Sequence, residues 1–357
     1  MAVFEGYTIL RDIALSFLVT SIAFSIEFAI YFAWEWYKKT KRNIYDLRFA
    51  WAFFLIGWAF NNIFYIMADF YTSGETRIMW IRMGYLALLI GVTIFANIQE
   101  RALPWNTHNF FGLLGVSGIA LAIFLPHDIA KVVLPFVYVP LFLFLFTSFS
   151  LIMIKKTRGL FRFYSILFFV GFVIGIVAFE LTSDVSVATF GTISYAIGTV
   201  LIVAGIMIMS FSITTLPSFG EMDWHQKIRE IYLMHKDGTV LAHVTKEKKS
   251  KVEEKVIKTE STTQAISGIN KLLKEVTQSE KTVEAIDYSD TKLLFGATNN
   301  AVLVVVAEED LETIREKIGE FMTIFNNIYK DILQQGLTDD LQIFKPAEAT
   351  IRRIFEI

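Results

Sequence analysis

The chain has 357 residues, of which 54% are hydrophobic and 19% are charged, and its mean hydropathy is +0.50. Soluble domains usually carry about 25% charged residues, so these values exclude an ordinary water-soluble enzyme. The chain has no cysteine, which also excludes disulfides, cysteine nucleophiles and thiolate metal sites.

The charge is distributed unevenly and marks two regions. Residues 1–219 hold 14 Lys and Arg against 11 Asp and Glu, whereas residues 220–357 hold 19 against 24. The long apolar runs lie in the first region. We therefore expect a membrane domain over residues 1–216, a soluble domain over residues 217–336, and a C-terminal amphipathic tail over residues 337–357.

The first region contains seven apolar runs that we interpret as membrane helices. About 20 apolar residues are needed to cross a hydrocarbon layer of ~30 Å. The runs cover Ile13 to Tyr37, Asp46 to Phe70, Thr76 to Gln99, Asn109 to Leu125, Ala130 to Ile154, Phe161 to Thr182 and Ala188 to Thr215. They predict a seven-helix bundle, and Pro135 and Pro140 predict a distortion of its fifth helix.

Basic loops indicate how the bundle is oriented. The loop after the first run carries Lys38 to Arg42, and the loop after the fifth carries Lys155 to Arg162. By the positive-inside rule both loops are cytoplasmic. The short loops on the other side, residues 71–75, 126–129 and 183–187, have no Lys or Arg. We expect a multi-pass protein of the cell membrane, with its N-terminus outside and its soluble domain in the cytoplasm.

The second region has the pattern of a small α/β domain. Strand-like runs cover Glu230 to His235, Thr239 to Thr245, Thr282 to Tyr288, Lys292 to Thr298 and Ala301 to Ala307. Asp237-Gly238 between the first two is a strong hairpin signal. Apolar residues at helical spacing predict helices over Thr262 to Val276 and Leu311 to Ile332. With a leading helix over Glu221 to Arg229, the order is αββαβββα.

This order, the hairpin at residues 231–238 and the strand before the last helix resemble the roadblock and longin family. The resemblance implies a five-stranded antiparallel sheet and a non-catalytic role. Members of the family bind small GTPases, dimerise or scaffold signalling complexes. The seven-run region loosely resembles the seven-helix sensor regions of prokaryotic histidine kinases, although no kinase module follows it.

Polar side chains inside the runs are the candidate functional residues, because a charge at the bilayer centre costs at least ~2.5 kcal/mol. Glu27, Asn61 and Asn62 lie near mid-depth, whereas Asp69, Arg77, Arg82 and Glu180 are expected in the outer third. We expect Glu180 or Asp69 to neutralise Arg82. As ligand-binding candidates we name Arg82, Asp69, Glu180, Glu27, Asn61 and Asn62. Three interpretations stay open: a polar clamp that fixes helix packing, a pocket for a polar ligand or ion, and contact of the outermost residues with lipid headgroups.

Several kinds of chemistry lack support in the sequence. The last run has no lysine for a retinal Schiff base, and neither histidine metal motifs nor Gly-rich phosphate loops occur. We therefore expect no catalytic residue, metal or cofactor, and no nucleic-acid binding. Gly171 and Gly175 predict close contact between helices. The basic loop from Lys246 to Lys258 is either a solvated loop or a contact to anionic membrane lipid.

The hypothesis that follows is a seven-helix membrane sensor or adaptor. It couples an outer-side or intramembrane ligand to a cytoplasmic module that binds a small GTPase or a second roadblock/longin-like domain, as in a homodimer. A receptor predicts an outer cavity lined by Arg82, Glu180 and Asp69. Two alternatives remain: a transporter predicts a path through Glu27 and Asn61, and a scaffold predicts a packed bundle without a cavity.

Overall fold

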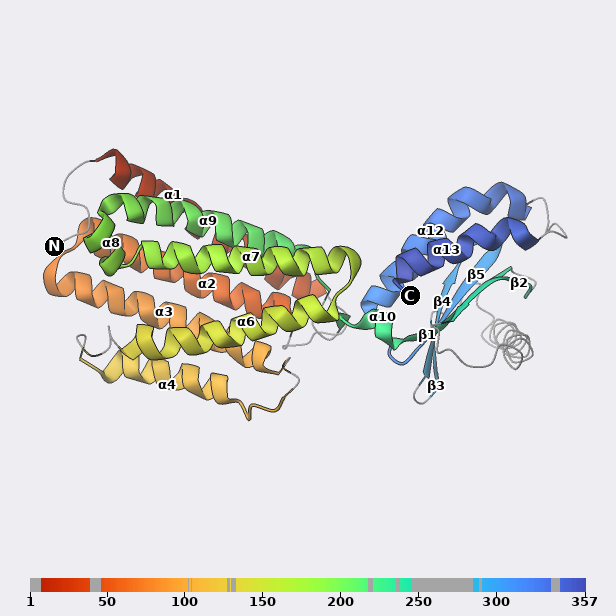
Figure 1. Cartoon of the computed structure of the whole chain (residues 1–357), viewed down its shortest axis with the longest axis horizontal. Helices are drawn as coiled ribbons and strands as arrows, with labels where there is room; N and C mark the ends of the chain where they lie inside the picture. Colours follow the sequence, from red (N-terminus) through yellow and green to blue (C-terminus); the bar gives the residue numbers. More distant parts are fainter. Residues whose placement is uncertain are drawn as a thin grey trace. The chain divides into compact units, whose positions relative to one another are not determined.

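The computed structural model describes residues 8–38, 46–101, 103, 105–126, 129, 133–217, 221–235, 238–245, 285–288, 291–334 and 341–357. The chain folds into two compact units, Met1–Met222 and Asp223–Ile357, which we call the helical unit and the α/β unit (Figure 1). A helical apolar region followed by a five-stranded antiparallel sheet was expected, and this coarse architecture is confirmed.

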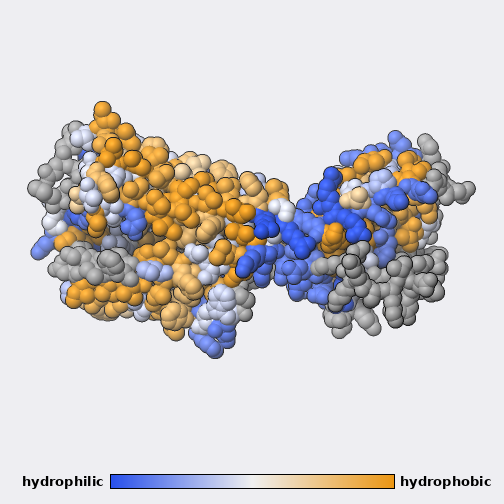
Figure 2. Space-filling view, in the orientation of Figure 1, coloured by the Kyte–Doolittle hydropathy of each residue, from blue (hydrophilic) through white to orange (hydrophobic). Residues whose placement is uncertain are grey.

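Among its described residues, the helical unit contains six helices that are long and apolar enough to cross a membrane. They are α1 (Ile9–Lys38), α2 (Leu47–Ile66), which continues into the π-helical turn η1 (Met67–Tyr71), α3 (Gly74–Glu100), α6 (Val139–Lys156), α7 (Gly159–Leu181) and α9 (Thr192–Thr215). Apolar residues dominate the face of this unit that Figure 2 shows, as expected for a surface in contact with lipid.

The fourth predicted span is shorter than expected. Its helix, α4 (Phe110–Phe124), has 15 residues and is about 22 Å long, less than the ~30 Å of hydrocarbon. The predicted count of seven full-length spans is therefore not confirmed. Nevertheless α4 packs along α3 in the bundle (Figure 1).

The fifth predicted span is distorted where the prolines predicted it. A second π-helical turn, η2 (Leu134–Tyr138), contains Pro135 and leads into α6, which has Pro140 in its first turn. Because proline lacks an N–H group, it shifts the hydrogen-bond ladder of a helix. Part of the predicted run, residues 130–132, lies outside the described residues.

The core of the helical unit is aromatic. The Trp51 ring lies 4.8 Å from the Phe54 ring, 5.4 Å from that of Phe95 and 5.7 Å from that of Phe168. Its indole N–H donates to the hydroxyl of Ser210 at 3.2 Å. Indole and phenyl rings from α2, α3 and α7 thus fill the interior around α9, and the one polar group of Trp51 is satisfied.

Glycines bring α7 and α9 into direct backbone contact, as Gly171 and Gly175 predicted. A Cβ atom placed on Gly205 of α9 would lie 3.0 Å from the carbonyl oxygen of Gly171 and 3.1 Å from the backbone nitrogen of Gly175. No larger residue fits at this point without moving a helix. The contact fixes α9 against α7. The short helix α8 (Asp184–Phe190) connects these two helices along the chain.

The α/β unit contains one sheet of five antiparallel strands in the order β2-β1-β5-β4-β3. The strands are β1 (Ile228–His235), β2 (Val240–Thr245), β3 (Ala285–Tyr288), β4 (Thr291–Ala297) and β5 (Ala301–Ala307). Tyr232, Met234 and Val304 form a buried apolar cluster on one face. On the other face lie α12 (Glu312–Gln334) and α13 (Lys345–Phe355), which pack against each other (Figure 1).

The two ends of this unit can be compared with the sequence prediction. The leading helix expected over Glu221 to Arg229 is only α10 (Trp224–Lys227), because Ile228 already pairs with Ala307 in the sheet. The predicted C-terminal amphipathic tail packs on its own unit: Ile351 and Phe355 of α13 are buried, and α13 contacts β2. The helix predicted over residues 262–276 and the basic loop lie outside the described residues.

Whether α4 crosses the membrane can be tested by labelling the two ends of the segment from α3 to α7. Arg77 and Asp184 form an ion pair with an N–O distance of 2.7 Å, so the chain returns to the same end of the bundle after α3, α4, α6 and α7. A chain returns to the same end only after an even number of crossings, so α4 must cross as well as α3, α6 and α7. We expect cysteines introduced singly at Ser73 and Val185 to react with an impermeant thiol reagent on the same, outer face of intact cells.

The native chain has no cysteine, so any labelling reports the introduced one. Labelling of the two variants on opposite faces would show that α4 does not cross. Labelling of both only after lysis would reverse the predicted orientation.

Candidate functional site

Buried polar residues of the helical unit gather on one face of α2 and η1. Asn61, Tyr65 and Asp69 are spaced four residues apart, and this spacing places them one above another on a helix. Asn61 and Asp69 are 3% and 2% exposed. Asp69 belongs to the π-helical turn η1, and such turns are frequent at functional sites. The polar face points into the bundle, so these groups need partners from other helices.

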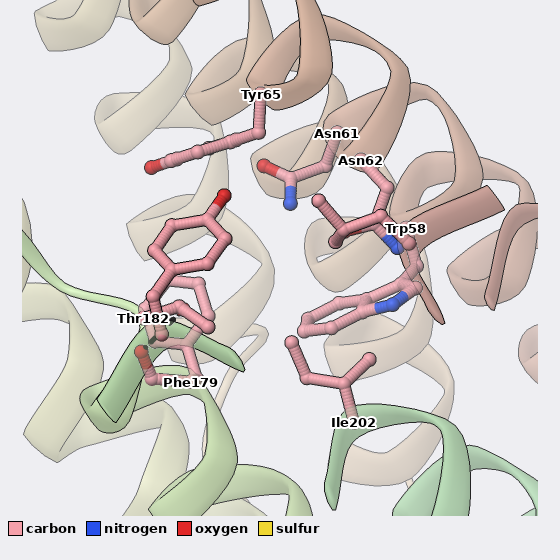
Figure 3. Close-up of a pocket in the computed structure, with 9 residues that line it drawn as sticks. Trp58, Asn61, Asn62, Tyr65, Phe179, Thr182 and Ile202 are labelled. Carbon is pink, nitrogen blue, oxygen red and sulfur yellow. Dashed lines mark hydrogen bonds between the residues drawn. The ribbon is translucent and has the colours of Figure 1, made fainter. Parts of the chain in front are cut away.

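Beside these residues lies a cavity of about 20 Å³ between α1, α2, α7 and α9. Its lining combines four aromatic, three polar and two aliphatic residues: Trp58, Tyr65, Phe179 and Tyr195, then Asn61, Asn62 and Thr182, then Leu18 and Ile202. Figure 3 shows the Asn61 amide pointing into the space between the Tyr65 and Trp58 side chains. A volume of this size holds about one water molecule.

One acceptor in the cavity is unsatisfied. The side-chain oxygen of Asn61 is buried and has no hydrogen-bond partner among the described residues. Its neighbour Asn62 donates its amide to the hydroxyl of Ser21 at 3.0 Å, and the Trp58 indole N–H approaches the same hydroxyl at 3.4 Å. A buried oxygen without a partner costs roughly 1–3 kcal/mol. A water molecule or a cation in the cavity would remove that cost.

Gly84 of α3 allows this arrangement. A Cβ atom at this position would lie 3.0 Å from the Tyr65 ring and 3.3 Å from the side-chain oxygen of Asn61. The glycine therefore lets α3 approach the polar face of α2 closely. The ring of Tyr85, the next residue, lies edge to face with the Tyr65 ring at 6.3 Å.

An ion-pair network lies next to the cavity. The Asp69 carboxylate accepts from Nη2 and Nε of Arg77 at 2.9 and 3.1 Å, and from the Tyr195 hydroxyl at 3.0 Å. The same guanidinium reaches Asp184 at 2.7 Å. Whereas Asp69 is buried, the side chain of Asp184 is 68% exposed. The network therefore joins η1, α3, α8 and α9, and its inner half is shielded from solvent.

The structure brings together some of the residues predicted for the site. Asp69, Asn61 and Asn62 share one face of one helix, but Asp69 pairs with Arg77, so the predicted Arg82–Asp69 pair is wrong. Arg77 lies in the first turn of α3, next to the end of η1, whereas Arg82 lies five residues, or about 7.5 Å, further along the axis. The Arg82 guanidinium instead donates to the carbonyl oxygen of Leu125.

The two other predicted carboxylates lie outside the cavity. Glu180 and Glu27 are both exposed, and neither forms an ion pair with Arg82 among the described residues. The sequence did not single out Tyr65, Tyr195 or Asp184 as site residues. Tyrosines are common in apolar helices and Asp184 lies in a connecting segment, so only the spacing of Tyr65 between Asn61 and Asp69 offered a signal.

The arrangement has room for a water molecule or a small ion. Within the described part of the chain, no three His, Asp or Glu side chains are grouped so that they could hold a metal ion. Comparison of the chain with family models, curated proteins and solved structures finds no match.

The ion-pair network predicts unequal effects of two matched substitutions. Asp69→Asn leaves the Arg77 charge without its buried partner, and this change typically costs about 3–5 kcal/mol. Asp184→Asn removes an exposed partner and should cost about 1 kcal/mol or less. Thermal unfolding in detergent, followed by tryptophan fluorescence, measures both. Equal small shifts would mean that solvent already screens Asp69.

Proposed function

We propose that the protein is a membrane sensor or adaptor, in which the helical unit responds to a small ligand in its polar cavity and the α/β unit binds another protein in the cytoplasm. One observation carries the proposal: α9 lines the cavity and is the last long helix of the helical unit before the α/β unit along the chain. Tyr195 and Ile202 of α9 line the cavity. The α9 helix ends at Thr215, and the α/β unit begins at Asp223.

The position of α9 in the bundle makes it suitable for this coupling. Of the six long apolar helices it is the most buried, with 61% of its most apolar window inside. It also carries Tyr195, which contacts the ion-pair network. A change at the cavity therefore acts directly on the helix that leads into the α/β unit.

The cavity restricts the ligand to a very small one. A volume of about 20 Å³ accepts a water molecule or a bare monovalent cation, and an organic solute is too large. The ligand groups available are the amide oxygen of Asn61 and phenolic hydroxyls, and oxygen donors suit hard cations. We therefore propose Na⁺ or K⁺ as the ligand class, in place of the larger polar ligand that a receptor implies.

The two alternatives differ from this proposal in measurable ways. The transporter hypothesis requires a path through Glu27 and Asn61, but Glu27 is exposed on α1 and does not line the cavity that contains Asn61. The scaffold hypothesis predicted a packed bundle without a cavity, and with the cavity beside Asn61 present it requires that nothing but water binds there. Dependence on a specific cation separates a sensor from a scaffold.

The protein-binding role rests on the α/β unit. Its sheet ends at β3, which pairs only with β4 among the described strands, and an open sheet edge is a docking site for another chain. Near the helix pair, Ile328, Leu341 and Ile343 are exposed. The resemblance to the roadblock and longin family makes a small GTPase or a second domain of that kind the first candidate partner.

The cavity predicts a cation effect on stability. We expect Na⁺ or K⁺ to raise the melting temperature of the full chain in nanodiscs, relative to choline at the same ionic strength. A ligand at 100 times its Kd adds about 2.7 kcal/mol. Asn61→Leu, which removes the amide, should abolish the effect, whereas Asn97→Leu, the same change outside the cavity lining, should keep it. No difference between the three cations in the wild type would favour the scaffold.

The exposed apolar residues predict a partner-binding phenotype. The full chain in nanodiscs should retain a small GTPase from its native lysate in one nucleotide state, as measured by quantitative mass spectrometry. Ile328→Asp should abolish retention, because it places a charge on the apolar surface. Thr323→Asp adds the same charge to an exposed polar position of α12 and should have little effect. A protein that retains no GTPase with GDP or with a GTP analogue would rule out this partner.

A further inference from the structure

Glu27 places a carboxyl group on the outside of the helical bundle at membrane depth. It lies 16 residues from Arg11 and 11 residues from Lys38, that is about 24 Å and 16 Å along the axis of α1. Both distances place it well inside a hydrocarbon layer of ~30 Å. The side chain is exposed, and among the described residues no ion pair or hydrogen bond to it occurs.

The exposure of Glu27 is not caused by an arbitrary rotation of α1. Ser21 and Ser25 of the same helix are buried, and Ser21 bonds to Asn62 in the interior. At 100° per residue, Glu27 is about 200° from Ser25, on the opposite side of the helix. Ionisable side chains in membrane helices nearly always face protein or a water-filled cavity. The outer face of α1 is therefore expected to be covered.

Glu27 belongs to a regular seam on this face. The seam alternates steps of four and three residues along nearly the whole helix: Ser16, Thr20, Ala23, Glu27, Ile30, Trp34 and Tyr37. All of these residues are exposed except Thr20, which is half-buried. A spacing of 3.5 residues is that of a helix packed lengthwise against another helix. The small residues at positions 16, 20 and 23 permit close approach in one half of the seam.

A second copy of this chain fits the seam best. All copies insert with the same orientation, so a two-fold axis along the membrane normal places the two Glu27 side chains at the same depth. A carboxylic acid is self-complementary, because its protonated form donates and its ionised form accepts. A cationic partner from the same chain is excluded among the described residues, since none of its exposed Lys or Arg lies near the middle of a span.

We propose that two copies of the chain pack α1 against α1 along this seam, with the Glu27 carboxyl groups hydrogen-bonded to each other across the two-fold axis. Each copy then buries its Glu27 carboxyl group against the other. This interface is separate from the cavity and from the exposed apolar residues of the α/β unit. The proposed dimer therefore does not depend on whether the cavity binds a cation or the α/β unit binds a GTPase.

Cysteine cross-linking in native membranes tests the interface, because the chain has no native cysteine. We expect Ile30→Cys to form a disulfide-linked dimer on oxidation. Val173→Cys, at an exposed position in the middle of α7, should stay monomeric. Monomers with both variants, or dimers with Val173→Cys alone, would overturn the proposed surface.

The role of Glu27 needs a second measurement. In the full chain without cysteines, single-molecule photobleaching in liposomes gives the monomer–dimer equilibrium. Glu27→Leu should lower the association constant about tenfold, since one interhelical hydrogen bond contributes that order of affinity in membranes. Glu27→Gln keeps a self-complementary amide and should restore most of the dimer. An unchanged equilibrium for Glu27→Leu, with an unchanged melting temperature, would overturn the Glu27 contact.

Discussion

The Asp69 carboxylate contacts the guanidinium of Arg77 and the hydroxyl of Tyr195 inside the helical unit, where an unpaired charge would cost several kcal/mol. This requirement fixes where η1, the start of α3 and the start of α9 meet. Asn61 and Tyr65 lie two turns and one turn from Asp69 on the same face. The position of the cavity therefore follows from the position of the ion pair.

The same constraint explains why the cavity is small. The Asp69 carboxylate next to it is paired with Arg77, and the Asn62 amide donates to Ser21. Among the described residues that line the cavity, the Asn61 oxygen is the buried acceptor without a partner, and one atom or molecule is sufficient to satisfy it. A site of this kind cannot select among large solutes. It has room for one ion or one water beside α9, which the glycine contact with α7 holds in place.

Some parts of the structure could be predicted from the sequence, because they depend on local patterns. Apolar runs identified the long helices, and Gly238 of the predicted hairpin lies between β1 and β2 with a φ of 98°. The partner of Asp69 could not be found in this way. From the sequence, Arg77 and Arg82 were equally possible partners of Asp69. The tight turn between η1 and α3 brings Arg77 to Asp69. Tyr195 and Asp184 reach the site through the tertiary fold, so no periodicity reveals them.

Glu27 shows how a correct sequence observation can carry the wrong expectation. A carboxyl group at membrane depth was expected inside the bundle, yet the structure places it outside. The two faces of α1 then have different roles. Ser21 holds Asn62 and Trp58 at the cavity, while Glu27, less than two turns away, faces outwards. Since α1 is a single rigid helix, a dimer formed along its outer seam would also fix the wall of the cavity, and occupancy of the cavity would in turn affect the dimer.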